Sequence, residues 1–202
     1  MSRAYFLNPG EVPILGVSGR AGSGKDFMAD LAVERLGFLK VPLANHFKVE
    51  AAAVGALQGD SSFFNALWCG GPKPDELREL LQLTGTEHGR DVHGEDVWVA
   101  HAEAWIGYFA RQSGVRGFIV PDIRFPNELS WVHALGGRVY RLVGRGGLDG
   151  ARSEHRSEVA LDGLEHAFDR VIDNTVGYEN DAVGVMLASL QHYFPDHYRG
   201  TV

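Results

Sequence analysis

The chain has 202 residues, of which 45% are hydrophobic, enough to bury the core of a single domain spanning residues 1–202. Its net charge of −7, without a basic stripe, argues against general nucleic-acid binding and favours small phosphorylated partners. The single cysteine excludes an internal disulfide, and no apolar run approaches the ~20 residues of a membrane helix, so we expect a cytoplasmic protein that binds no membrane.

The first predicted elements are a strand, a glycine-rich loop and a helix. Residues 13–18 form a short apolar run that suits a buried parallel strand. After the loop, apolar residues recur at helical spacing from Phe27 to Leu36, and Gly37 supplies a stop signal. A phosphate-binding loop requires this order of elements.

The rest of the chain alternates between strands and helices. Strands are expected at residues 38–44, 117–122, 138–143 and 168–172, helices at 45–57, 75–84, 95–112 and 180–193, and a loop at 59–74. This alternation predicts an α/β fold with a parallel sheet whose site lies at the carboxyl ends of the strands. Trp98 and Trp105, seven residues apart on one helix, are expected to lie in the core.

Residues 19–26, Gly-Arg-Ala-Gly-Ser-Gly-Lys-Asp, match the phosphate-binding pattern G-x-x-x-x-G-K-[ST] except at the last position. The glycines allow turns that direct backbone N–H groups inward, and the helix N-terminus faces the anion. The lysine adds an ammonium group for the outer phosphates. We expect the whole loop to bind the phosphates of a nucleotide: Gly19, Arg20, Ala21, Gly22, Ser23, Gly24, Lys25 and Asp26.

Asp26 stands where Ser or Thr normally offers a hydroxyl group to Mg²⁺. A carboxylate also binds this ion, directly or through water, because Mg²⁺ prefers hard oxygen ligands. Alternatively, Asp26 caps the start of the helix. The loop pattern alone leaves both interpretations open.

Residues 122–128, Asp-Ile-Arg-Phe-Pro-Asn-Glu, place charges directly after a strand that is expected to be buried. Asp122 at such a strand end can hold Mg²⁺ or its waters, and Arg124 can reach a phosphate. The alternative is a capped helix start, in which Asp122 or Asn127 binds backbone N–H groups and Glu128 favours the helix dipole. We favour function for Asp122 and Arg124.

Two further segments carry candidate binding residues. Residues 144–158 are rich in glycine and suit a flap that closes over phosphates and places Arg145, Arg152 or Arg156 on the transferred group, although a solvated surface loop is the alternative. An acceptor-binding insertion would lie at about residues 45–94. It contains Arg78, Thr86, Glu87 and Arg90.

Taken together, these segments resemble the phage-type deoxynucleoside monophosphate kinases. The matching segments are residues 19–26, Leu-Thr-Gly-Thr-Glu-His-Gly-Arg at 83–90, residues 122–128 and His-Arg-Ser-Glu at 155–158. The Asp-x-Arg-Phe-Pro-Asn-Glu segment is the most specific of them. The resemblance implies a P-loop NTPase fold of three layers, α/β/α, with acceptor-binding and lid insertions, and it makes Asp26 a feature of the family.

The implied reaction is transfer of the γ-phosphoryl group of ATP to a deoxynucleoside monophosphate, with Mg²⁺ as cofactor. On this basis we assign catalysis to Lys25, Asp122, Arg124, Arg152 and Arg156, the metal to Asp26 and Asp122, and the acceptor to Arg78, Thr86, Glu87, Arg90, Asn127, Glu128 and His155. A homodimer is possible, as is a host cytoplasm if a phage encodes the protein.

Three alternatives stay open at this point. The first is another small-molecule kinase, acting on dephospho-coenzyme A or phosphomevalonate. The second is a GTP-dependent switch, which is disfavoured because no lysine lies in an Asn-Lys-x-Asp motif. The third is a nucleotide-binding protein without catalytic activity.

Overall fold

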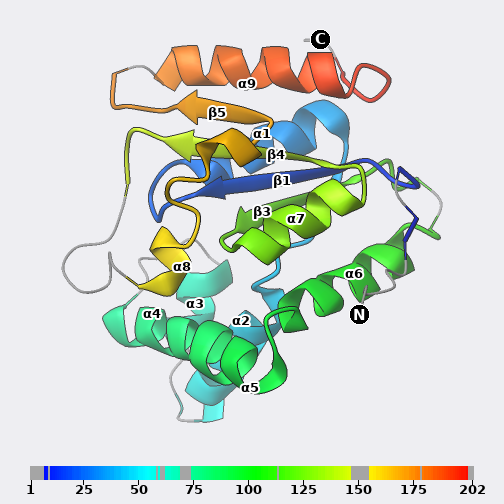
Figure 1. The fold of residues 1–202 in the computed structure, drawn as a ribbon. Helices are drawn as coiled ribbons and strands as arrows, with labels where there is room; N and C mark the ends of the chain where they lie inside the picture. Colours follow the sequence, from blue (N-terminus) through cyan, green and yellow to red (C-terminus); the bar gives the residue numbers. More distant parts are fainter. Residues whose placement is uncertain are drawn as a thin grey trace. The chain divides into compact units, whose positions relative to one another are not determined.

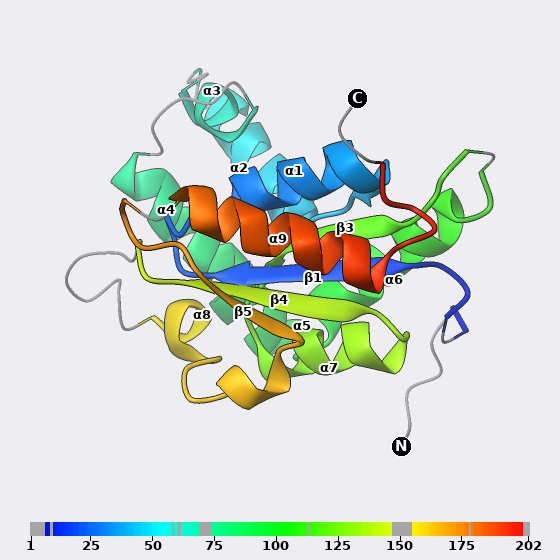
Figure 2. The same cartoon turned by 90° about the horizontal axis from the view of Figure 1, so that it is seen from above.

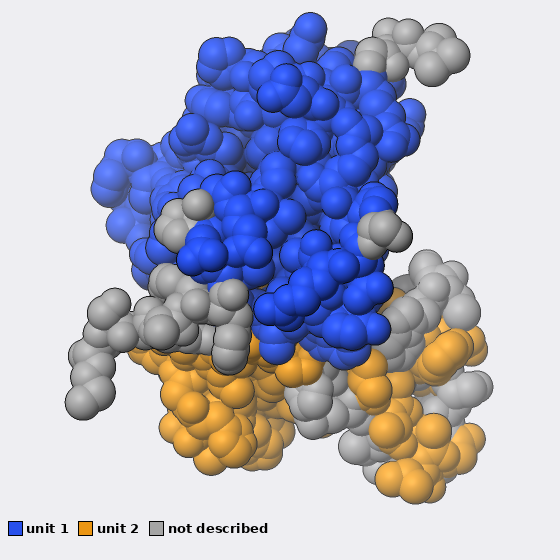
Figure 3. Space-filling model, turned by 90° about the vertical axis from the view of Figure 1, so that its right-hand side faces the viewer, with its two compact units in different colours: residues 1–42, 102–202 blue, residues 43–101 orange. Residues whose placement is uncertain are grey.

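The computed structural model describes residues 7–8, 10–57, 59, 62–68, 74–112, 114–146, 155–177 and 179–199. The chain divides into two compact units, which Figure 3 shows in different colours. Unit 1 comprises Met1–Pro42 and Ala102–Val202, and unit 2 comprises Leu43–His101. Unit 2 contains the segment expected to form the acceptor-binding insertion, and that role stays a prediction.

Unit 1 is built on a five-stranded sheet in which every neighbouring pair of strands is parallel, as predicted. The strands are β1 (Ile14–Gly19), β2 (Leu39–Lys40), β3 (Phe118–Ile123), β4 (Arg138–Val143) and β5 (Arg170–Asp173). Their order in the sheet is β2-β3-β1-β4-β5. The glycine loop therefore follows the central strand.

Helices cover both faces of the sheet and make three layers (Figures 1 and 2). On one face lie α1 (Lys25–Leu36) and α9 (Glu179–Tyr193), which pack against each other, and on the other lies α7 (Pro126–Ala134). Because β1 is covered on both sides, its side chains are buried in an unbroken run instead of in alternation. The core joins Leu15 of β1 to Met28 of α1 and Met186 of α9.

The second strand is shorter than the prediction over residues 38–44. β2 has two residues and lies at the edge of the sheet. Val41 still donates its N–H to the Ile119 carbonyl oxygen at 2.8 Å. Because Leu39 and Val41 face β3, the position of Pro42 faces away from it, toward the open side of this edge strand, where a residue without an N–H is tolerated.

Unit 2 is helical in the residues that the structure describes. Its elements are α2 (Asn45–Leu57), α3 (Ser62–Trp68), α4 (Asp75–Gln82), the π-helix η1 (Leu83–Arg90) and α5 (Asp91–His93). The prediction of a loop at residues 59–74 is wrong at Ser62–Trp68, because these residues form the helix α3. This helix forms because Ala66 is buried beside Leu77 of α4, with Leu67 packed against the same small cluster.

The helix α6 (Val97–Phe109) begins in unit 2 and ends in unit 1. Trp98 is buried, and its Nε1–H donates to the Gly85 carbonyl oxygen at 2.6 Å, which confirms its place in a core. Trp105 is 46% exposed and stacks on Phe109, so the prediction that it lies in the core is wrong. The boundary between the units falls between the two tryptophans.

Two short elements complete the described part of the chain, α8 (Arg156–Val159) and the 3₁₀ turn η3 (Glu165–Ala167). Within the residues described, no helix has both the length and the apolar character needed to cross a membrane.

Candidate active site

The glycine loop connects the carboxyl end of β1 to the start of α1. It therefore lies at the end of the sheet that is formed by the carboxyl ends of the parallel strands. Gly24 precedes the helix with a φ of 88°, which side chains rarely adopt. A Cβ atom there would lie 2.5 Å from Nδ2 of Asn174. Both the turn and the close approach thus require glycine. The first turn of α1 leaves backbone N–H groups without helical partners, and these groups suit an anion.

Asp26 is the second residue of α1, and its side chain is 78% exposed. Because Gly24 occupies the N-cap position, the alternative that Asp26 caps the helix is wrong. Its Oδ2 lies 3.8 Å from Nζ of Lys25. An exposed carboxylate beside the loop suits a cation that is bound together with phosphates.

Lys25 is only 8% exposed, although it carries a charge. Burial, and after it the neighbouring Arg124 guanidinium, hold the pKa of Lys25 below its ordinary value. The carboxylates of Asp26, Glu158 and Asp122 act in the opposite direction. A phosphate in the loop would add a further negative charge and favour the charged ammonium group.

Asn174, which follows β5, supports the loop and was missed by the sequence analysis. Its Nδ2 donates to the Ser23 carbonyl oxygen at 2.8 Å, and the residue is buried. Its position in the sequence could have identified it, because a polar residue directly after the last parallel strand lies at the same end of the sheet as the loop.

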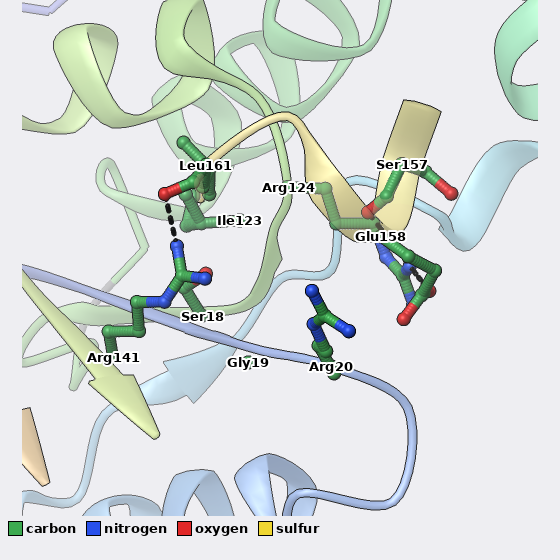
Figure 4. Close-up of a pocket in the computed structure, with 9 residues that line it drawn as sticks. All are labelled: Ser18, Gly19, Arg20, Ile123, Arg124, Arg141, Ser157, Glu158 and Leu161. Carbon is green, nitrogen blue, oxygen red and sulfur yellow. Dashed lines mark hydrogen bonds and ion pairs between the residues drawn. The ribbon is translucent and has the colours of Figure 1, made fainter. Parts of the chain in front are cut away.

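Arg124 follows β3 and meets α8 next to the loop (Figure 4). Its Nη1 forms an ion pair with Oε1 of Glu158 and donates to the Ser157 carbonyl oxygen at 3.3 Å. The other carboxylate oxygen of Glu158 accepts the backbone N–H of Ala21, in the glycine loop, at 3.0 Å. Glu158 lies in the matched segment 155–158, yet the sequence analysis assigned it no role.

Glu128 shapes the turn that carries Arg124. Its Oε2 accepts the backbone N–H of Arg124 at 2.7 Å and that of Phe125 at 3.0 Å. The buried carboxylate thus closes the start of α7, one of the two roles that the sequence leaves open for it. Asp122, near the end of β3, and Asn127, in the first turn of α7, are half-buried.

Two more arginines, Arg20 and Arg141, line a small pocket with Arg124 (Figure 4). Arg141 is buried in β4 and donates to the Leu161 carbonyl oxygen at 2.5 Å. Asp162 pairs with Arg141 at 2.6 Å and with Arg20 at 2.5 Å. The pocket encloses about 10 Å³, room for about one water molecule. The sequence analysis missed Arg141, because one charge within an apolar strand forms no motif.

A larger cavity of about 190 Å³ is lined by Arg20 and by residues 141–146. Gly146, with a φ of 85°, lies against the glycine loop. A Cβ atom on it would be 2.4 Å from the Ala21 carbonyl oxygen and 2.5 Å from the Ser23 nitrogen. The half-buried Arg145 also lines this cavity. The first residues of the expected flap therefore lie directly beside the loop.

The later part of the expected flap is described only from residue 155. Arg152 lies outside the described residues. His155 caps α8, since its Nδ1 accepts the Ser157 N–H at 3.2 Å. Arg156 is the first residue of α8 and is exposed. Neither His155 nor Arg156 lines the two cavities described above.

Four residues expected to bind the acceptor lie in unit 2. Thr86 and Arg90 are buried in η1, Glu87 of the same helix is exposed, and Arg78 on α4 is half-buried. π-helical turns are rare and occur frequently at functional sites. The role of these residues stays a prediction.

Within the described part of the chain, no group of three or more His, Cys, Asp or Glu side chains could hold a metal ion. Mg²⁺ needs no such group, because it commonly takes one or two carboxylates together with substrate phosphates and keeps several waters. Asp26 and Asp122, whose charges both act on Lys25, offer two such carboxylates. The residues present therefore fit Mg²⁺ bound with phosphates.

A glycine loop after the central strand of a parallel sheet, followed by a helix that starts with a buried lysine, defines an α/β protein of the P-loop class. The chain belongs to the same family as the "Uncharacterized protein ORF77" of Ictalurid herpesvirus 1. The two are 31% identical over 176 residues, which cover 86% of this chain and 69% of that protein.

Other comparisons give similarities at lower sequence identity. A protein of Acanthamoeba polyphaga mimivirus named "Putative deoxynucleotide monophosphate kinase" is 26% identical over 175 residues, 80% of this chain and 88% of that protein. Among solved structures, TT1252 from Thermus thermophilus covers 91% of this chain and 98% of its own at 20% identity and a TM-score of 0.49. Dephospho-CoA kinase from Campylobacter jejuni has the same coverage and TM-score at 15% identity. No family model matches the chain.

Proposed function

We propose that this protein is a kinase that transfers the γ-phosphoryl group of ATP to a deoxynucleoside monophosphate, giving ADP and a deoxynucleoside diphosphate. The observation that carries the proposal is the buried Lys25 at the end of the glycine loop, with Arg124 close enough to lower its pKa. The name of the mimivirus relative and the four matched segments support the choice of acceptor.

Transfer between two phosphates requires little covalent chemistry from the protein, so positioning and charge neutralisation supply the catalysis. The loop amides and Lys25 bind the donor phosphates. Arg124, together with Arg152 and Arg156 of the flap, binds the transferred group. An oxygen of the acceptor phosphate attacks the γ-phosphorus in line, and no nucleophilic side chain is needed.

Asp26 and Asp122 would hold Mg²⁺, which would supply positive charge to offset the negative charge of the phosphates. The residues assigned to the acceptor are those predicted from the sequence: Arg78, Thr86, Glu87, Arg90, Asn127, Glu128 and His155. The cytoplasmic location and the homodimer stay predictions of the sequence.

The test is the formation of ADP and diphosphates from ATP and Mg²⁺ with a panel of acceptors. The panel contains the four deoxynucleoside monophosphates, their ribose counterparts and dephospho-coenzyme A. Turnover that is confined to deoxynucleotides is the expected result. Turnover of dephospho-coenzyme A alone would replace the proposed acceptor while keeping the kinase, and no turnover of any acceptor would reject the kinase.

A further inference from the structure

The buried side chain of Glu158 connects three separate segments of unit 1. It belongs to α8, its Oε1 pairs with the Arg124 guanidinium after β3, and its Oε2 accepts the Ala21 N–H of the glycine loop at 3.0 Å. The side chain is 3% exposed. Its charge also acts on Lys25.

We infer that Glu158 is a positioning residue of the kinase, which holds the Arg124 guanidinium against the glycine loop so that it faces the transferred phosphoryl group. This inference rests on the proposed function, since it assigns Glu158 an effect on turnover that is exerted through Arg124. In this proposal, Glu158 itself contacts neither nucleotide.

The first argument is the freedom of the arginine side chain. The Arg124 side chain is 30% exposed, and Glu158 and the Ser157 carbonyl oxygen both bind its Nη1. Both partners belong to one turn of α8, so they define one orientation of the guanidinium. Charge-assisted hydrogen bonds of this kind are about twice as strong as neutral ones and fix geometry as well as energy.

The second argument is charge. Arg124 lowers the pKa of Lys25, and the two cations therefore oppose each other. The carboxylate of Glu158 offsets this repulsion before a phosphate arrives. The Glu158 carboxylate is buried and the Arg124 side chain is 30% exposed, and a partly buried pair is screened by salt much less than a pair in open solvent.

The chain offers a matched control in Asp169. This carboxylate also pairs with an arginine, Arg138 at 2.9 Å, and also accepts a backbone N–H, that of Val139 at 2.8 Å. It lies at the amino ends of the strands, and the glycine loop lies at their carboxyl ends. Asp169→Asn removes a comparable set of bonds away from the site.

The experiment is a double-mutant cycle on the full chain, with kcat and the KM for ATP measured for Glu158→Gln, Arg124→Lys and the double variant. Arg124→Lys keeps a charge but loses the planar fork that Glu158 orients. We expect Glu158→Gln to lower kcat about tenfold with the KM for ATP within about threefold, and to have less than about a twofold effect in the Arg124→Lys background. Asp169→Asn should leave kcat unchanged, although it lowers the melting temperature.

Multiplicative effects of the two substitutions, or a Glu158→Gln protein with wild-type kcat, would overturn the positioning role while leaving the kinase intact. Absence of turnover in the wild-type protein would overturn both proposals, so the two failures are distinguishable. If Glu158→Gln does not fold, the same cycle is run with Glu158→Asp, which keeps the charge on a shorter arm and is expected to show the same coupling at a smaller amplitude.

Discussion

The sheet carries a carboxylate–arginine pair at each of its ends, and the two pairs differ in their surroundings. Glu158 pairs with Arg124 at the carboxyl ends of the strands, and Asp169 pairs with Arg138 at the amino ends. Each carboxylate also accepts one backbone N–H. The further partner of Asp169 is His133 of α7, at 3.0 Å, so this cluster joins α7, β4 and the segment before β5.

Glu158, in contrast, has the glycine loop and Lys25 beside it. Similar bonds therefore stabilise the fold at one end of the sheet and, in our proposal, orient a catalytic group at the other. The residue types do not distinguish the two roles. The position relative to the strand ends does, because only the carboxyl ends face the loop.

The largest expected effect is a loss of turnover when the lysine of the glycine loop is removed. Lys25→Ala removes the ammonium group that binds the donor phosphates, and we expect turnover to fall at least ~100-fold. The control is Lys40→Ala, which removes the partly exposed partner of Asp30 and should leave turnover within about twofold. Near-wild-type ADP formation by a folded Lys25→Ala protein would contradict the proposed mechanism.

A second difference is expected for two glycines that share a left-handed backbone. Gly146 has a φ of 85° and no room for a Cβ atom beside the loop, whereas Gly163 has a φ of 79° and open space. Gly146→Ala should raise the KM for ATP about tenfold, because the clash with Ala21 must displace the loop. Gly163→Ala introduces backbone strain without a steric clash, so the KM for ATP should not change. Equal KM values for the two variants would show that the close approach is unimportant.

A smaller effect is expected for the residue that supports the loop from behind. Asn174→Ala removes one hydrogen bond to the Ser23 carbonyl oxygen. Titration with ATP should show about fivefold weaker binding, in line with a neutral hydrogen bond of ~1 kcal/mol. The exposed Asn180 supplies the matched control, Asn180→Ala, and equal affinities for the two variants would argue against the support.

At the amino ends, the expected effect is on stability alone. Burial by itself would raise the pKa of Asp169, but hydrogen bonds from a backbone N–H, a histidine and an arginine outweigh it and hold the pKa below its ordinary value. The cluster therefore stabilises the fold above the unfolded-state pKa of about 3.9, and this contribution is lost as the pH falls through the lower pKa of the folded state.

Asp169→Asn should thus lower the stability at neutral pH by about 1–3 kcal/mol without changing turnover. Thermal melts at about pH 6 and about pH 3 provide the check. The melting temperature of the wild-type protein should fall more between these pH values than that of the variant, because the variant lacks the titrating group. An equal fall of the melting temperature in both proteins would show that Asp169 does not contribute to the loss of stability in acid.

Most of the fold was predictable because its signals are local. The apolar runs located β1, β3, β4 and β5 within two residues, and helical spacing located α1 and α9. The prediction failed at α3, whose burial depends on Leu77 of a separate helix, and at Trp105, which is 46% exposed because no other element in the described part of the chain covers its position on α6. In both cases, the deciding contact or its absence lies outside the segment.

The sequence by itself determined the glycine loop, its lysine and the strand and helix on either side, because glycine positions and apolar spacing act over a few residues. Only the tertiary structure decided which side chains support that loop. Ala21 and Glu158 are 137 residues apart, and Ser23 and Asn174 are 151 residues apart. Such pairs meet because the order β2-β3-β1-β4-β5 brings the ends of distant strands to one edge of the sheet, and no local pattern encodes that order.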